Sequence, residues 1–257
     1  MVFINNSNYK LRLDLSNIRN NIMKLVTYTL AVAGLLLGGG VAAHAFPVVV
    51  NVVHGIDGRE LGAARELPVD IAINGGCALK RVAFSQSAII DADAGETYKV
   101  TVHPADGKCS ATPVISESLT IPNDGTTALS VVASLSAKGA PQLAVFNSTP
   151  RFFGIELAQV SVRNLVKSQP LFVQFKASPG GTTKRRSIQN GQADYYLDDA
   201  DRFSYRARVA TSAKGTPKFN LTGVASKKMV THYNIVGSAK NGFTVIKEEF
   251  DALRNMR

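Results

Sequence analysis

Arginine residues occupy alternate positions in one segment in the second half of this chain. The segment from Arg202 to Arg208 has the sequence RFSYRAR. In a β-strand, its period of two sends Arg202, Arg206 and Arg208 to one face, with a step of about 6 to 7 Å along the strand, and the aromatic residues to the other. Arginine binds phosphate or carboxylate through two N–H groups at once, which lysine does not. The pattern therefore predicts an anion-binding surface.

Two neighbouring charged runs, one basic and one acidic, could add to this surface or neutralise it. The exposed loop predicted over residues 178–186 ends in three consecutive basic residues, which can add to the arginine row. The alternative is an ordinary solvated face, whose arginines pair with the three aspartates between residues 198 and 201. The candidate anion-binding residues are Arg202, Arg206, Arg208, Lys184, Arg185 and Arg186.

The histidines do not have the spacing of a metal site. They are His54, His103 and His232, beyond residue 50. A zinc site uses three or four ligands with local pairs such as His-x-His, which this sequence lacks. His54 could share a metal with Asp57 and Glu60, and His103 with Asp106, if folding brings them together. We instead expect strand-end histidines that bond to backbone groups, and no metal site.

No segment has the spacing of a catalytic centre. The nucleophilic serine of many hydrolases lies in a strained Gly-x-Ser-x-Gly turn, and none occurs here. The pairs Gly75-Gly76 and Gly180-Gly181 are not followed by helical patterns, so they indicate turns rather than phosphate-binding loops. We therefore predict a protein that is not an enzyme and has no cofactor. A hydrolase would need a triad or metal site that the sequence does not display.

The chain has two cysteines, Cys77 and Cys109. An even pair in an exported protein indicates a structural disulfide, whereas a redox-active pair would have close Cys-x-x-Cys spacing. In chain-entropy models, closing a loop of about 30 residues stabilises a fold by about 3 to 4 kcal/mol, from which native strain subtracts.

Export itself is predicted by the segment from Met23 to Ala45. Lys24 supplies a positive start, residues 25–37 an apolar core, and Ala43 and Ala45 the small residues before a cleavage site, so we expect the mature chain to begin at Phe46. The apolar core is shorter than the ~20 residues of a membrane helix, so a transmembrane anchor is not expected. The predicted location is the periplasm or the medium.

Residues 1–22 precede this signal peptide and are rich in asparagine. We interpret them as an over-extended translation start. The alternative is a long, positively charged first region of the same signal peptide. Neither interpretation changes the mature protein.

Charge divides the rest of the chain into two unlike halves. Residues 46–150 contain 7 Lys or Arg and 10 Asp or Glu, whereas residues 151–257 contain 18 and 8. The basic half could face lipopolysaccharide phosphate, nucleic acid or an acidic protein, or it could form a solvated surface. Because no aromatic-basic stacking motif accompanies the charge, the solvated surface is favoured for this half, and nucleic acid is not an expected partner.

The sequence after the signal peptide consists of short β-branched and aromatic runs separated by turn-forming pairs such as Asp106-Gly107 and Lys138-Gly139. Runs of this length and spacing are typical of a β-sandwich. In the first half, strands are predicted over residues 46–56, 67–74, 98–103, 115–121, 129–135 and 142–146.

The second half repeats this order of runs with a period of about 100 residues. Segments 160–166, 170–175, 201–207 and 231–240 correspond to segments 50–56, 68–73, 95–100 and 130–138. The predicted fold class is all-β, with two tandem immunoglobulin-like sandwiches over residues 46–147 and 154–248 and a linker at 147–153. In the short tail that follows, 249–257, the helical spacing of Ile246, Phe250 and Leu253 predicts a turn or two of helix.

Five motifs occur in order in the first repeat. They are VNVVHG at 50–55, VDIAING at 69–75, AGETYKV at 94–100, TTALSVVA at 126–133 and APQL at 140–143. In this order they resemble a family of exported bacterial sandwich domains, domain of unknown function 4397. The resemblance covers residues 46–147 and, more faintly, the second repeat, where Asn164 replaces His54 and Gln174 replaces Asp70. It implies an immunoglobulin-like envelope or extracellular module without an established enzymatic role, and it names no ligand.

Export, a disulfide, duplication and the missing active site together favour a non-catalytic envelope protein with a binding or structural role. The expected partner is an acidic envelope component or an envelope protein. The alternative is a periplasmic assembly chaperone that binds its clients by strand addition, because pilus chaperones are also basic, exported proteins of two sandwiches. The Leu-Phe-Tyr-Arg type of motif of that family is not found here.

Overall fold

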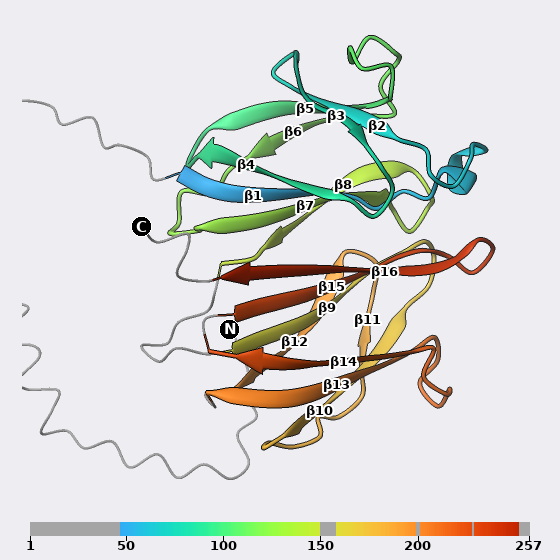
Figure 1. The fold of residues 1–257 in the computed structure, drawn as a ribbon. Helices are drawn as coiled ribbons and strands as arrows, with labels where there is room; N and C mark the ends of the chain where they lie inside the picture. The colour runs from blue at the N-terminus through green and yellow to red at the C-terminus, as the bar shows by residue number, and fades with distance from the viewer. Residues whose placement is uncertain (1–46, 150–157, 199–200, 228, 252–257) are drawn as a thin grey trace, which may run out of the picture. The chain divides into compact units, whose positions relative to one another are not determined.

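The computed structural model describes residues 47–149, 158–198, 201–227 and 229–251, and most of these lie in β-strands. The strands form four sheets of four strands each, and the sheets are packed in pairs (Figure 1). The predicted all-β fold of two sandwiches is therefore confirmed. No helix in the described part of the chain is long and apolar enough to span a membrane. The predicted signal peptide and residues 1–22 lie outside the described residues.

The first sandwich holds the first half of the chain. Its elements are β1 (Pro47–His54), the 3-10 helix η1 (Gly58–Leu61), β2 (Val69–Ile73), β3 (Gly76–Val82), β4 (Ser87–Asp93), β5 (Thr97–Pro104), β6 (Ile115–Thr120), β7 (Ala128–Leu135) and β8 (Pro141–Asn147). One sheet has the order β4-β1-β7-β8 and the other β3-β2-β5-β6. β-branched residues dominate the core between them, including Val50, Ile71 and Val131.

The second sandwich follows the same plan. Its strands are β9 (Ala158–Val166), β10 (Leu171–Ser178), β11 (Arg186–Ile188), β12 (Gln192–Asp198), β13 (Arg202–Ala210), β14 (Phe219–Ser226), β15 (Met229–Ser238) and β16 (Gly242–Asp251). The sheet orders are β12-β9-β15-β16 and β11-β10-β13-β14. Aromatic residues are more prominent in this core, where Phe175, Phe203 and Tyr205 pack together with Tyr196.

The two sandwiches have identical topology. Adding eight to each strand number of the first sandwich gives the sheet orders of the second. In both, the first strand pairs in parallel with the seventh, as β1 with β7 and β9 with β15. The segments matched in the sequence repeat overlap β1 and β9, β2 and β10, β5 and β13, and β7 and β15, which are equivalent strands of this plan.

The helical turn predicted for the tail is wrong in its described part. Ile246 lies within β16, which runs to Asp251 and pairs with the whole length of β15. The long antiparallel partner overrides the helical spacing, because every residue of the segment gains a cross-strand neighbour. Six strands were also not predicted from the sequence: β3, β4, β11, β12, β14 and β16.

Both sandwiches belong to one compact unit, and their sheets β4-β1-β7-β8 and β12-β9-β15-β16 pack against each other. We call this contact the seam. Its apolar part contains Val53, Phe84, Val132, Ala144, Phe146, Leu165, Val236 and Ile246. All residues of β7 and β9 are buried, because these strands have a sandwich core on one face and the seam on the other.

The polar part of the seam is centred on an ion pair between Arg163 and Glu248, whose Nη1 and Oε1 atoms lie 3.3 Å apart. The two side chains are 0 and 1 % exposed. Glu248 also accepts hydrogen bonds from Asn51 and Ser130 of the first sandwich. Arg163 donates to Ser148, so both charges bond across the seam.

Candidate functional site

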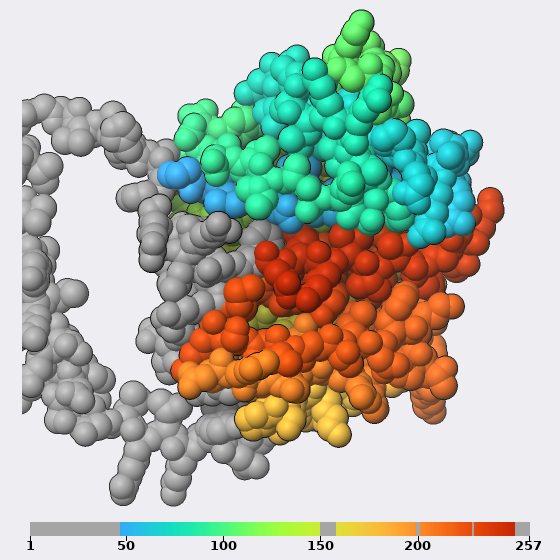
Figure 2. Space-filling model, in the orientation of Figure 1, coloured from blue at the N-terminus to red at the C-terminus, as the bar shows by residue number. Residues whose placement is uncertain are grey.

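The predicted arginine row lies on the outer face of the sheet β11-β10-β13-β14. Along β13 the side chains of Phe203 and Tyr205 are buried, those of Arg202 and Arg206 are exposed, and that of Arg208 is half-buried. The hydroxyl of Tyr205 contacts the hydroxyl of Tyr233 at 2.6 Å inside the core. The aromatic residues thus anchor the inner side of β13, and the alternation turns its arginines to solvent. In Figure 2 the orange part of the chain, which contains β13 and β14, forms part of the surface.

The strand register sets the neighbours of these arginines. Lys176 of β10 lies directly opposite Arg206, and Thr222 of β14 lies opposite Arg206 on its other side. We call the outward-facing residues of these three strands the basic face. They are Phe172, Gln174, Lys176, Ser178, Arg202, Ser204, Arg206, Arg208, Asn220, Thr222, Val224 and Ser226.

The basic face carries four positive side chains and no carboxylate. Within the described residues, Lys176, Arg202, Arg206 and Arg208 make no ion pair or side-chain hydrogen bond. Like charges directly opposite each other on neighbouring strands are destabilising. The fold therefore retains an unfavourable arrangement at Lys176 and Arg206.

Two of the aspartates proposed as partners for the arginines bond to other residues, and the third lies outside the described part of the structure. Asp201 bonds to Lys227 at 2.8 Å, which lowers the pKa of its carboxyl. Asp198 accepts a hydrogen bond from the Tyr196 hydroxyl. Asp199 lies outside the described residues. Neither described aspartate neutralises the basic face.

A shallow depression occupies the middle of the basic face. It has a volume of about 350 Å³ and is open to solvent. Its lining combines two positive side chains, Lys176 and Arg206, with the hydroxyls of Ser178, Ser204 and Thr222. Positive N–H donors surrounded by hydroxyl groups are suited to an oxygen-bearing anion.

Two of the other three candidate residues make their contacts away from this face. Arg186 points to the open side of the sandwich, where it pairs with Asp194 at 3.3 Å. Arg185 donates to the carbonyls of Ala213 and Gly215 and so holds the turn between β13 and β14. Lys184 is exposed. The register also adds Lys176 to the arginine row, a residue that sequence reasoning missed because alternation gives the face of a residue and not its cross-strand neighbour.

No family model matches this chain, and no curated protein is similar to it at a significant level. The resemblance to the exported bacterial domain family therefore stays a prediction.

The first sandwich provides an internal comparison for the basic face. β5 is the equivalent of β13, and its outward residues include Thr97, Lys99 and Thr101. The same fold thus forms with one lysine and two threonines on this strand. The arginine row and its lysine neighbour are an addition of the second sandwich that the fold itself does not require.

His54 and His103 bond to backbone carbonyls, as predicted for strand-end residues, whereas His232 lies within β15 and bonds to a serine hydroxyl, so the prediction is wrong for this residue. Nε2 of His54 lies 2.8 Å from the carbonyl oxygen of Leu67. The nearby carboxylates that could have shared a metal bond elsewhere: Asp57 pairs with Arg59, and Glu60 accepts from Ser238 and Asn241 across the seam. These three groups do not form a ligand set.

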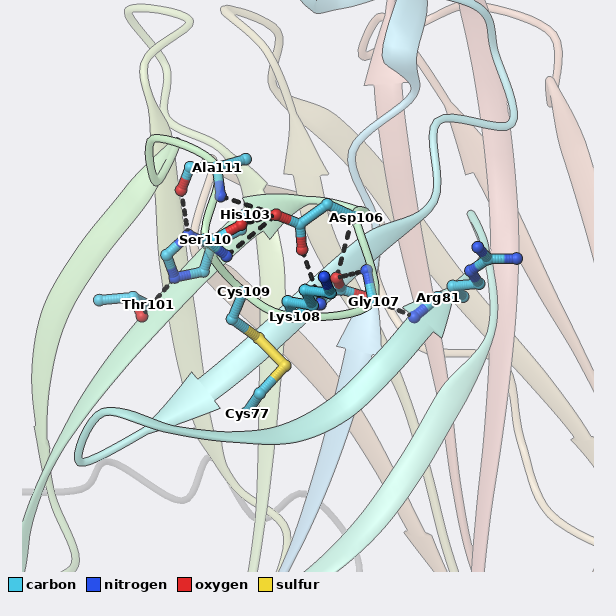
Figure 3. The surroundings of a disulfide bond; sticks show 11 residues. Cys77, Arg81, Thr101, His103, Asp106, Gly107, Lys108, Cys109, Ser110 and Ala111 are labelled. Atoms are coloured by element: carbon cyan, nitrogen blue, oxygen red, sulfur yellow. Dashed lines mark hydrogen bonds between the residues drawn. A yellow bond between two sulfur atoms is a disulfide. The ribbon is translucent and has the colours of Figure 1, made fainter.

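His103 lies near the end of β5, close to the disulfide and to a loop that is organised by carboxylates (Figure 3). Its ring bonds to Thr101 and to the carbonyl of Ala111. Asp106 accepts hydrogen bonds from the Ser110 hydroxyl and from the backbone N–H groups of Lys108, Ser110 and Ala111. The hydroxyl bond first, and then the backbone bonds, hold the pKa of its carboxyl well below the usual range. The carboxylate thus shapes the loop.

The predicted disulfide is confirmed: Cys77 of β3 is bonded to Cys109 (Figure 3). The carboxylate of Asp70 lies near the two sulfur atoms, within 4.8 Å, which is a spacing compatible with a metal. The sulfurs are joined to each other, however, and Asp70 accepts from the backbone of Arg81, Asp106 and Gly107. This group clamps the loop to the sheet and does not offer free ligands.

A serine–histidine contact in the seam also escaped the sequence analysis. Ser161 Oγ lies 2.6 Å from Nδ1 of His232, and both side chains are fully buried. Burial and the nearby charge of Arg163 lower the pKa of His232 well below its usual value. The pair resembles a nucleophile and base in spacing, but it lies between packed sheets, where a substrate does not reach it.

Proposed function

We propose that this chain is a non-catalytic exported envelope protein whose second sandwich binds an anionic component through the basic face. The observation that carries the proposal is the position of Lys176 directly opposite Arg206 on a face without a carboxylate. A bound anion would neutralise the repulsion and accept charge-assisted hydrogen bonds from both side chains.

Three further observations support an anion-binding role. The arginines project from a rigid central strand of the sheet, which holds donors more precisely than a loop does. Hydroxyl groups line the depression beside Arg206 and Lys176. The equivalent strand of the first sandwich has a different set of outward residues, so the arginines are not a requirement of the fold.

Salt-dependent retention on immobilised heparin, a generic polyanion, tests this function. We expect the double variant Arg206→Ala/Arg208→Ala to elute at clearly lower salt than the parent protein, because each lost cation removes a contact that salt screens. Lys99→Ala, in the equivalent strand of the first sandwich, is the matched control and should elute with the parent. Equal retention of all three proteins would refute the proposal.

A further inference from the structure

We infer that the basic face binds a linear acidic polysaccharide that lies along β13, an inference that rests on the anion-binding function proposed above. Three of the four positive side chains, Arg202, Arg206 and Arg208, project from this one strand. They span about 20 Å along it. A compact anion such as a single phosphate reaches one or two of these residues, whereas a chain with repeated negative groups reaches all three.

The uncharged residues of the basic face fit a hydroxylated ligand. Ser178, Ser204, Thr222 and Ser226 flank the arginine row, and within the described residues their side chains make no hydrogen bond. Each hydroxyl can donate and accept. Sugar hydroxyls have the same double capacity, whereas a polyphosphate offers acceptors alone and would use these side chains only as donors.

The aromatic residues argue against a single-stranded nucleic acid as the ligand. Proteins that bind single strands without sequence preference stack the bases on exposed aromatic rings. Here Phe203 and Tyr205 of β13 point into the core. On the outer side of the sheet, which carries the arginines, Phe172 of β10 is half-buried. It lies opposite Ala210, at the end of β13 that is far from Arg202. No stacking platform accompanies the described charges.

The depression gives the polysaccharide a place to seat one acidic sugar. Its volume of about 350 Å³ lies between Lys176 and Arg206. A carboxylate placed there meets both positive side chains, while Ser204 and Thr222 remain available for ring hydroxyls. The neighbouring Arg208 lies one step of about 7 Å further along the strand, where the next negative group of an extended chain can reach it.

Calorimetric titration with oligogalacturonates from the monomer to the hexamer tests this inference on the purified protein. We expect the hexamer to bind at least tenfold more tightly than the monomer. Arg206→Ala should weaken hexamer binding about tenfold, since one charge-assisted contact is lost. Arg202→Ala should reduce the gain in affinity with chain length and leave monomer binding unaffected, because Arg208 still receives the negative group next to the depression. Lys99→Ala is the control and should bind as the parent does.

Polyphosphate and a thymidine oligonucleotide, measured in the same buffer, separate the possible failures. If either binds more tightly than the hexamer and still depends on Arg206, or if monomer and hexamer bind equally, the polysaccharide inference is overturned while anion binding stands. If no probe binds in an Arg206-dependent manner, the proposed function fails as well. The inference is supported if the uronates bind more tightly than the other two probes, and if their affinity rises with chain length and falls in Arg202→Ala.

Discussion

Lys176 and Arg206 lie directly opposite each other on β10 and β13, and no carboxylate shares their sheet face. Such a pair costs stability in the free protein. We therefore expect Arg206→Thr to raise the melting temperature by about 1 to 2 °C while it weakens retention on heparin. Differential scanning fluorimetry beside heparin chromatography checks this. A fall in both properties would show that Arg206 supports the fold instead, and Lys99→Thr should change neither.

The buried pair of Arg163 and Glu248 should contribute strongly to the stability of the seam. Removing one partner leaves an uncompensated charge between packed sheets, so Glu248→Ala should lower the free energy of unfolding by about 3 to 5 kcal/mol in chemical denaturation. The exposed pair of Lys247 and Glu249 is the matched control: Glu249→Ala should cost less than about 1 kcal/mol.

A double variant separates the ion pair from simple packing. Arg163→Met combined with Glu248→Leu removes both charges and keeps most of the volume, so it should be less destabilised than Glu248→Ala alone. If the free energy of unfolding falls as much in the double variant as the sum of its falls in Arg163→Met and Glu248→Leu, the two charges do not act as a pair.

Histidine protonation should destabilise the protein as the pH falls below about 6.5. Burial lowers the pKa of His54 and, together with the charge of Arg163, that of His232, below the usual value of 6.5. The folded state therefore binds fewer protons than the unfolded state, so this stability is present above pH 6.5 and declines as the pH falls toward the folded pKa values. Melting temperatures between pH 7.5 and 5 should fall less steeply for His232→Gln. An unchanged slope would contradict this assignment.

The disulfide should stabilise the first sandwich. Cys77 and Cys109 are separated by 32 positions, and the loop that ends at Cys109 is held by Asp70 and Asp106. Replacing both cysteines by serine should lower the free energy of unfolding by about 3 to 4 kcal/mol. Calorimetry with and without a reductant checks this, because the reductant should act on the parent and leave the variant unchanged. Heparin retention of the folded variant should match the parent, since the basic face is in the other sandwich.

The face of each residue on β13 was predictable from the sequence. Phe203 and Tyr205 alternate with the arginines within this one short segment. The aromatic side chains are buried in the core, so the alternation turns Arg206 and Arg208 to the outer face. The neighbour of Arg206 was not predictable. Lys176 reaches it through the pairing of β10 with β13, and strand register depends on the whole sheet.

The seam was also hidden from sequence reasoning. Asn51, Ser130 and Arg163 alternate with apolar residues, as in strands with one solvated face, yet all three are buried. Their burial depends on a second sheet that covers them and on Glu248, which bonds to each of them. Complementary polar groups so far apart in the chain leave no local pattern. The unusual feature was that Arg163, the one charged residue of β9, lies in the middle of this strand.

The Nε–H signals of the arginine side chains in nuclear magnetic resonance spectra provide the most direct test of the basic face. On titration with a heparin hexasaccharide, we predict shifts at Arg206 and Arg208 and none at Arg163, which is buried in the seam. The shifts should disappear when the salt concentration is raised. Binding that leaves Arg206 and Arg208 unshifted, with changes on the first sandwich instead, would contradict the account.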